Sequence, residues 1–98
     1  MDIPTLSKKE EYILDFLRDG NKSYALEMVK NSEGLLKKGT IYVVLYDLED
    51  RGYIKSELEN KNPNSIGPAR RMYKIDGLGE KVLEAWCKYK LSIEGVFE

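Results

Sequence analysis

The amino-terminal half of the chain places its hydrophobic residues at helical spacing. The first such run follows Ser7 and Glu10, which form a capping-box pattern that marks the start of a helix. Its apolar positions are Tyr12, Ile13, Phe16 and Leu17. The run stops at Asp19-Gly20-Asn21, a sequence typical of a helix end. We therefore predict a first helix between Ser7 and Asp19.

Two further helices are predicted before residue 52. Ser23 is the expected cap of a short second helix, which closes at Asn31-Ser32-Glu33-Gly34. Its apolar positions are Leu26, Met28 and Val29. A third helix is expected from about Lys38 to Asp50, and Gly52 occupies the usual stop position behind it. Its apolar stripe is Ile41, Val44, Leu45 and Leu48.

The second half of the chain begins with the alternating pattern of two strands, Tyr53–Glu59 and Ala69–Ile75. Ile54 and Leu58 share one side of the first strand, and Tyr73 and Ile75 turn inward from the second. Residues 60–68 are almost all turn formers, which predicts a hairpin with an extended polar tip. Asp76 is the expected cap of a last helix that runs to roughly Ile93.

This order of elements predicts an α+β fold that is mainly helical. Residues 1–76 would form a winged helix-turn-helix of three helices and a two-stranded wing. Residues 77–98 would add a carboxyl-terminal dimerisation helix and tail, packed as part of the same single domain.

Composition excludes several classes of protein. The 98 residues suffice for one domain, and no apolar run approaches the roughly 18–20 residues of a membrane span. The amino terminus lacks the features of a signal peptide, so we expect a cytoplasmic protein. Cys87 is the only cysteine and histidine is absent, which leaves no material for an ordinary zinc site or a His-activated nucleophile. We expect no catalytic residues, no metal and no cofactor.

Basic residues are concentrated in the middle of the chain, although the net charge is −1. Residues 37–74 hold eight basic and five acidic side chains, whereas each flanking part has two more acidic than basic side chains. Lys37 and Lys38 lie at the start of the third helix, where the helix dipole disfavours cations. A DNA phosphate between the lysines and the backbone amides would explain them. The alternative is that they are solvated surface lysines.

The exposed face predicted for the third helix is suited to the major groove of double-stranded DNA. This face carries Thr40, Val43, Tyr46 and Asp47, opposite the apolar stripe. The phenols of Tyr42 and Tyr46 can bond a phosphate, although either alone is more often a packing residue. The wing adds Lys61 near its tip and Arg70 and Arg71 on its returning strand. These three are candidate DNA contacts, or they protect an edge strand from aggregation.

From Leu35 to Gly79 the chain resembles the PadR family of transcriptional regulators. The likeness is carried by the order and spacing of GTIY (39–42), LEDRGYI (48–54) and GPARRMYKIDGLG (67–79). The resemblance implies a winged helix, dimerisation through the terminal helix, and binding to palindromic operators, usually as a repressor. It also implies that Thr40 and Tyr42 lie against the DNA backbone, near the arginines of the wing.

The chain departs from the family pattern beside these motifs. Lys37-Lys38 stands where the family often has Ser-Pro, Val43 stands where proline is common, and Ala25-Leu26 replaces a frequent Gly-Tyr. The lysines weaken a helix cap and add charge. The other changes are compatible with the fold but complicate any transfer of base specificity.

The last helix carries a narrow apolar seam of the kind that pairs with another helix. Its members are Leu78, Val82, Trp86, Tyr89 and Ile93. A homodimer built on this seam would place two recognition helices about one DNA turn (~34 Å) apart. Trp86 and Tyr89 are equally suited to cover the first helix, and family resemblance favours the dimer. Because some relatives stack flat ligands on a tryptophan there, Trp86 is also a candidate effector-binding residue, with core packing as the alternative.

The sequence therefore predicts a non-enzymatic, sequence-specific DNA-binding regulator that acts as a homodimer, with repression the mode that the resemblance implies. A small-molecule effector at the dimer seam is compatible with this function. The alternative is a winged-helix module that binds another protein, which the net charge of −1 favours because it gives no long-range attraction to DNA.

Overall fold

The computed structural model describes residues 5–59 and 70–96, with side chains described as far as Leu91. Its elements are α1 (Lys8–Phe16), the 3-10 turn η1 (Arg18–Gly20), β1 (Ser23–Tyr24), α2 (Ala25–Asn31), α3 (Ile41–Asp50), β2 (Ile54–Leu58), β3 (Arg71–Ile75) and α4 (Gly77–Val96). Within these residues, four α-helices accompany a small antiparallel sheet. The predicted fold class, a mainly helical winged helix with an added terminal helix, is confirmed.

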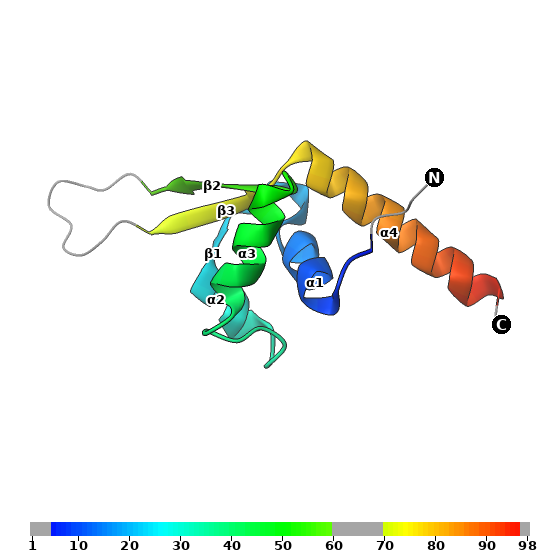
Figure 1. Ribbon diagram of the computed structural model, residues 1–98, viewed down its shortest axis with the longest axis horizontal. Coiled ribbons are helices and arrows are strands. Elements are labelled where there is room, and N and C mark those ends of the chain that lie inside the picture. The colour runs from blue at the N-terminus through cyan, green and yellow to red at the C-terminus, as the bar shows by residue number, and fades with distance from the viewer. Residues whose placement is uncertain (1–4, 60–69, 97–98) are drawn as a thin grey trace, which may run out of the picture.

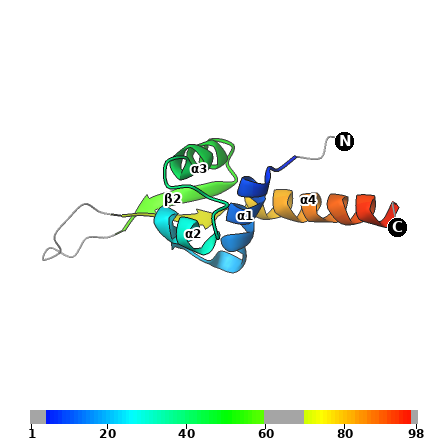
Figure 2. The same ribbon diagram turned by 90° about the horizontal axis from the view of Figure 1, so that it is seen from below.

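The wing and the last helix project in opposite directions from a body made of the three shorter helices (Figure 1). β2 and β3 extend to one side as the wing, and α4 extends to the other. Seen from below in Figure 2, α3 lies at one edge of the body. No other described element covers the outer side of α3 in that view.

The start of α1 is fixed by the predicted capping box. The Glu10 amide donates to Ser7 Oγ at 3.2 Å, and the Ser7 amide donates to Glu10 Oε1 at 2.9 Å. These bonds satisfy two of the amides that every helix leaves unpaired at its first turn. At the other end Asp19 and Gly20 both have positive φ, 69° and 79°, which turns the chain away from the helix.

The sheet has three strands, in the order β1-β3-β2, and not the two that the alternating pattern predicted. The added strand is Ser23–Tyr24, and Ser23 lies opposite Tyr73 of β3. The prediction that Ser23 caps the second helix is therefore wrong. Ser23 is 1% exposed and belongs to the sheet, while α2 begins at Ala25 after Tyr24. A two-residue strand is too short to show an alternating pattern in the sequence.

The core faces of α2 and α3 agree only in part with the apolar pattern. Ile41, Leu45 and Leu48 of α3 are fully buried and Val44 is half-buried, as predicted. Leu26, one of the apolar positions named for the second helix, is 48% exposed and lies outside the core. A helix of seven residues presents one narrow face to the core, and in α2 that face is taken by Ala25 and Met28.

Two predicted boundaries also change. The third helix was expected from about Lys38, but α3 begins at Ile41, and residues 37–40 form a turn in which the Lys37 carbonyl accepts from the Ile41 amide at 2.9 Å. Leu58 has the same orientation in the sheet as Ile54, yet it is 57% exposed. Leu58 lines an open hollow beside α2 and α3 and is not buried in the core.

A single residue, Asp76, joins β3 to α4. Its carboxylate accepts from the Gly77 amide at 2.8 Å, and its own amide donates to the Tyr53 carbonyl at 2.9 Å. Gly79 packs against this same carbonyl, because a Cβ at position 79 would lie 2.0 Å from the Tyr53 oxygen. The absence of a side chain at Gly79 therefore allows the start of α4 to lie directly on the turn between α3 and β2.

Candidate nucleic-acid interface

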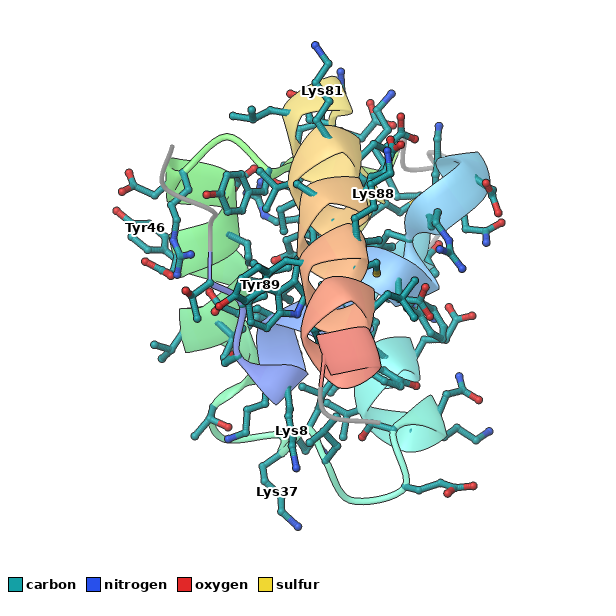
Figure 3. The ribbon with its side chains drawn as sticks, turned by 90° about the vertical axis from the view of Figure 1, so that its right-hand side faces the viewer. Lys8, Lys37, Tyr46, Lys81, Lys88 and Tyr89 are labelled. Atoms are coloured by element: carbon teal, nitrogen blue, oxygen red, sulfur yellow. The ribbon has the colours of Figure 1, made fainter. Side chains whose placement is uncertain are left out.

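The outer side of α3 exposes three large side chains that do not contribute to the core. Tyr42 is 54% exposed, Val43 is 70% exposed and Tyr46 is 74% exposed. In Figure 3, Tyr46 points away from the body. Thr40 and Asp47 are exposed on this side as well, and Asp47 forms an ion pair with Arg51. A small domain that places aromatic and branched side chains in solvent along one helix presents a surface suited to a binding partner.

The turn before α3 supplies positive charge at one end of this surface. Lys37 and Lys38 are both exposed, and Figure 3 shows Lys37 pointing away from the body on the same side as Lys8 of α1. Thr40 is the residue before the helix, and in the described structure its side chain forms no capping bond. The first turn, residues 41–44, contains no acidic side chain. The amino-terminal end of α3 is thus positive, from the helix dipole and from the two lysines.

The two arginines of the wing make contacts with different elements. Arg71 Nη1 donates to Ser56 Oγ at 2.9 Å, and Ser56 Oγ lies 2.5 Å from Glu49 Oε2 of α3. Arg70 instead places its guanidinium 5.2 Å from the centre of the Tyr24 ring. The adjacent arginines are therefore fixed by contacts with separate elements.

A hollow of about 850 Å³ lies between α2, the wing and the beginning of α3; we call it the α2–wing hollow. Its lining consists of Tyr24, Ala25, Leu26, Glu27, Lys30, Tyr42, Leu58, Arg70 and Arg71. The hollow has three cations against one carboxylate, so it favours an anion. The exposed Leu26 and Leu58 add apolar surface to the lining of this hollow.

The hollow brings together three of the predicted DNA contacts, Tyr42, Arg70 and Arg71, from segments far apart in the sequence. It leaves Lys37, Lys38, Thr40 and Tyr46 on or beside the exposed side of α3. Lys61 lies outside the described residues, and its role stays a prediction. Lys30 was missed, because a single lysine on a predicted helix carries no signal until the neighbouring wing is in place.

The predicted seam of α4 divides between the chain's own core and solvent. Val82 is 6% exposed and packs in the core of its own chain, and Trp86 is half-buried against that core. Leu78 and Tyr89 are 50% and 38% exposed. Tyr89 stacks on Trp86 with ring centres 5.7 Å apart, and the Ile93 side chain lies outside the described part of the chain. Trp86 therefore takes the covering role that the sequence left open, and Leu78 and Tyr89 stay exposed, so their place in a dimer interface remains a prediction.

Polar contacts also fasten α4 to α1. The Trp86 indole N–H donates to Glu11 Oε2 at 3.2 Å, and Lys90 Nζ pairs with Glu11 Oε1. The hydrogen bond from Lys90 lowers the pKa of the Glu11 carboxyl, burial opposes this shift, and the bond from Trp86 adds to it. The carboxylate of Glu11 therefore stabilises the contact between the two helices.

We expect the stability that Glu11 contributes to depend on pH. Because its pKa is lower in the folded chain, the contribution is present above the usual value of 4.5 and is lost as the pH falls through the folded-state pKa. Glu11→Gln should reduce the free energy of unfolding by about 0.5–1 kcal/mol at neutral pH, since the pair is partly exposed. Urea unfolding at pH 7 and pH 3 measures this. A difference from the parent chain that is as large at pH 3 as at pH 7 would contradict the assignment.

Comparison with known proteins identifies the relatives of this chain. The profile of the transcriptional regulator PadR-like family matches residues 13–85, most of the sequence. The chain belongs to the PadR-like family. A comparison with curated protein sequences gives no match.

Solved structures of regulators resemble this PadR-like chain over nearly its whole length. A transcriptional regulator from Clostridium thermocellum is 27% identical, with a TM-score of 0.72 and 95% of each chain covered. A PadR family transcription regulator from Clostridium difficile is also 27% identical, with a TM-score of 0.75 and coverage of 92% of this chain and 94% of the other. A PadR family regulator from Eggerthella lenta is 25% identical, with a TM-score of 0.68 and coverage of 89% and 76%.

Membership of the PadR-like family supports the predicted role in regulating transcription through DNA binding. Among the described residues, no helix of this PadR-like regulator has the length and apolar character needed to cross a bilayer. The effector role predicted for Trp86 stays a prediction.

Proposed function

We propose that this chain binds a two-fold symmetric DNA operator as a homodimer and represses transcription by occupying it. The observation that carries the proposal is the outer side of α3, where Tyr42, Val43 and Tyr46 are exposed. A pair of exposed lysines precedes this helix, and Tyr42 shares a hollow with the arginines of the wing. A helix entering the major groove needs this combination, because phosphate contacts position it and side chains at base edges specify the sequence. The cytoplasm is the expected location of such a regulator.

In the proposed complex, Lys37 and Lys38 contact phosphates at the amino-terminal end of α3, and Thr40 lies against the same strand of the backbone. Val43 and Tyr46 face base edges, where an apolar group and a phenol contribute to sequence preference. Tyr42 and the wing arginines contact the backbone on the other side of the helix, across the α2–wing hollow. Every element of the interface thus has a separate task.

The proposed homodimer uses the exposed side of α4. Leu78 and Tyr89 are eleven residues apart, about three helical turns, so they lie on the same side of the helix. Trp86 extends this surface through its stacking contact with Tyr89. A second copy packed there would bury both exposed side chains, and two-fold symmetry would bring the same surface from each chain together.

The function is tested by titrating the protein against DNA from upstream of its own gene at several salt concentrations. Specific binding should saturate at two chains per operator, and log affinity should fall against log salt with a slope near −0.9 per phosphate contacted. Equally weak binding to a scrambled sequence would contradict the regulatory role. Retention of a protein and not DNA on an affinity column would favour the protein-interaction module, which the net charge of −1 supports.

A further inference from the structure

Three polar side chains from three elements form one hydrogen-bonded chain at the base of the wing. Glu49 belongs to α3, Ser56 to β2 and Arg71 to β3. Arg71 Nη1 donates to Ser56 Oγ at 2.9 Å, and the Ser56 hydroxyl bonds Glu49 Oε2 at 2.5 Å. A hydroxyl has one proton and two lone pairs, so Ser56 donates to the carboxylate while it accepts from the guanidinium. Both roles of the serine are filled.

The register of the sheet places this chain of bonds on the side that faces α3. Ser56 lies opposite Tyr73 and Arg71 lies opposite Leu58, so Ser56 and Arg71 occupy the same face of the wing. On α3, Glu49 follows Tyr42 by seven residues, about two turns, which places both on the side toward the wing. Arg71 and Tyr42 accordingly line the same hollow.

The serine has a consequence for charge that a direct ion pair would not have. A carboxylate bonded straight to Arg71 would neutralise the guanidinium at close range and occupy two of its donors. With Ser56 between them, Glu49 orients the arginine through a single N–H, and the guanidinium has further donors for an anion in the hollow. An arginine that is already held also loses less side-chain freedom when it binds.

We infer that Glu49 and Ser56 are positioning residues that hold the Arg71 guanidinium beside the Tyr42 phenol, so that both address one DNA phosphate. This inference rests on the proposed function. The expected effect of Glu49 on DNA affinity is unusual, because a carboxylate near a DNA-binding surface ordinarily repels the phosphates and weakens binding. Here Glu49 strengthens binding although it is acidic, because its side-chain oxygen accepts from Ser56 and so helps to hold the Arg71 cation in place.

The test compares two substitutions that change charge equally. Glu49→Ala and Glu57→Ala each remove one negative charge, but Glu57 lies on the opposite face of β2 and pairs with Lys22 at 3.4 Å. Electrostatic repulsion alone predicts that both changes tighten DNA binding. We expect Glu57→Ala to leave affinity unchanged or higher, and Glu49→Ala to lower it about threefold to tenfold, the ratio that corresponds to one hydrogen bond. Fluorescence anisotropy with a labelled operator measures both.

Further variants separate positioning from folding. Ser56→Ala should lower affinity as Glu49→Ala does. Ser56→Thr and Glu49→Gln should instead keep the affinity of the parent chain, because threonine retains the hydroxyl and glutamine retains an acceptor oxygen. Arg71→Ala should lower affinity further and reduce the salt slope by about 0.9. In the Arg71→Ala background, Ser56→Ala should have no further effect, since the interaction that it supports is gone. Urea unfolding of each variant shows whether the protein remains folded at the assay temperature.

The outcomes of these experiments separate a failure of the positioning role from a failure of the proposed DNA binding. If Arg71→Ala weakens binding but Glu49→Ala and Ser56→Ala do not, the positioning role is overturned and DNA binding stands. If Ser56→Ala lowers affinity equally with and without Arg71, the serine acts on folding or elsewhere, and the inference fails. If the parent chain does not distinguish operator from scrambled DNA, the proposed function itself fails.

Discussion

Gly79→Ala is expected to lower the free energy of unfolding by about 3 kcal/mol or more, a large part of the stability of a domain of this size. A Cβ at position 79 would lie 2.0 Å from the Tyr53 carbonyl oxygen and 2.9 Å from Ile75 Cγ1. The obstructing atom is backbone, which cannot rotate away. The Tyr53 carbonyl also accepts a hydrogen bond from the Asp76 amide, so a shift of this carbonyl would break a bond that fixes the start of α4.

Urea unfolding followed by circular dichroism measures this loss. Gly77→Ala is the matched control, because nothing lies within 4 Å of a Cβ built there. Since alanine is the better helix former, the control should be unchanged or more stable by up to about 1 kcal/mol. Equal stability of the Gly79→Ala protein and its parent would show that α4 does not pack on Tyr53 as described.

The double substitution Lys37→Glu/Lys38→Glu should weaken operator binding by about 100-fold or more at 0.1 M salt. It would replace the two proposed phosphate contacts by repulsion at the end of α3, and the salt slope should fall by about 1.8 because two fewer phosphates would be neutralised. The loss should be similar for operator and non-specific DNA, since phosphate contacts carry no sequence information. Anisotropy titrations at several salt concentrations measure both quantities.

Lys81→Glu/Lys88→Glu is the control for this prediction. It alters net charge by the same amount, but Figure 3 shows both lysines projecting from α4, away from Lys37. The control should reduce affinity by less than about threefold, because charges beyond a Debye length of about 10 Å are largely screened. If the two doubles weaken binding equally, or if neither does, the assignment of Lys37 and Lys38 to phosphates is wrong.

Long amphipathic segments could be predicted from the sequence because one face of each is buried. The α3 stripe from Ile41 to Leu48 repeats for two turns, and the capping box at Ser7 marks the start of α1 by its own chemistry. Ser23 and Leu26 could not be predicted in this way. The two-residue strand and the seven-residue helix are too short for periodicity to indicate which side faces the core, and their contacts with β3 decide it.

In the candidate site as well, some residues could be predicted from helix periodicity and others could not. Lys37, Lys38 and Tyr46 could be named from the sequence because they lie on or beside a helix whose buried face was clear. The relation of Arg71 to Ser56 and Glu49 depends on strand register, which the sequence of a hairpin with a long tip does not specify. Val82 repeats with Trp86 and Tyr89, yet it packs in its own core, because α4 contacts α1 along one side and leaves the neighbouring side exposed.

The single-residue connection at Asp76 has a consequence for how the proposed dimer would meet DNA. A connection of one residue has little conformational freedom, so the directions of β3 and α4 are fixed relative to each other. A change in the angle between the two α4 helices of a dimer would therefore rotate both wings. It would also change the distance between the two α3 helices that read the DNA. In the proposed dimer, the packing angle at the dimer contact would thus set the operator spacing that the protein accepts.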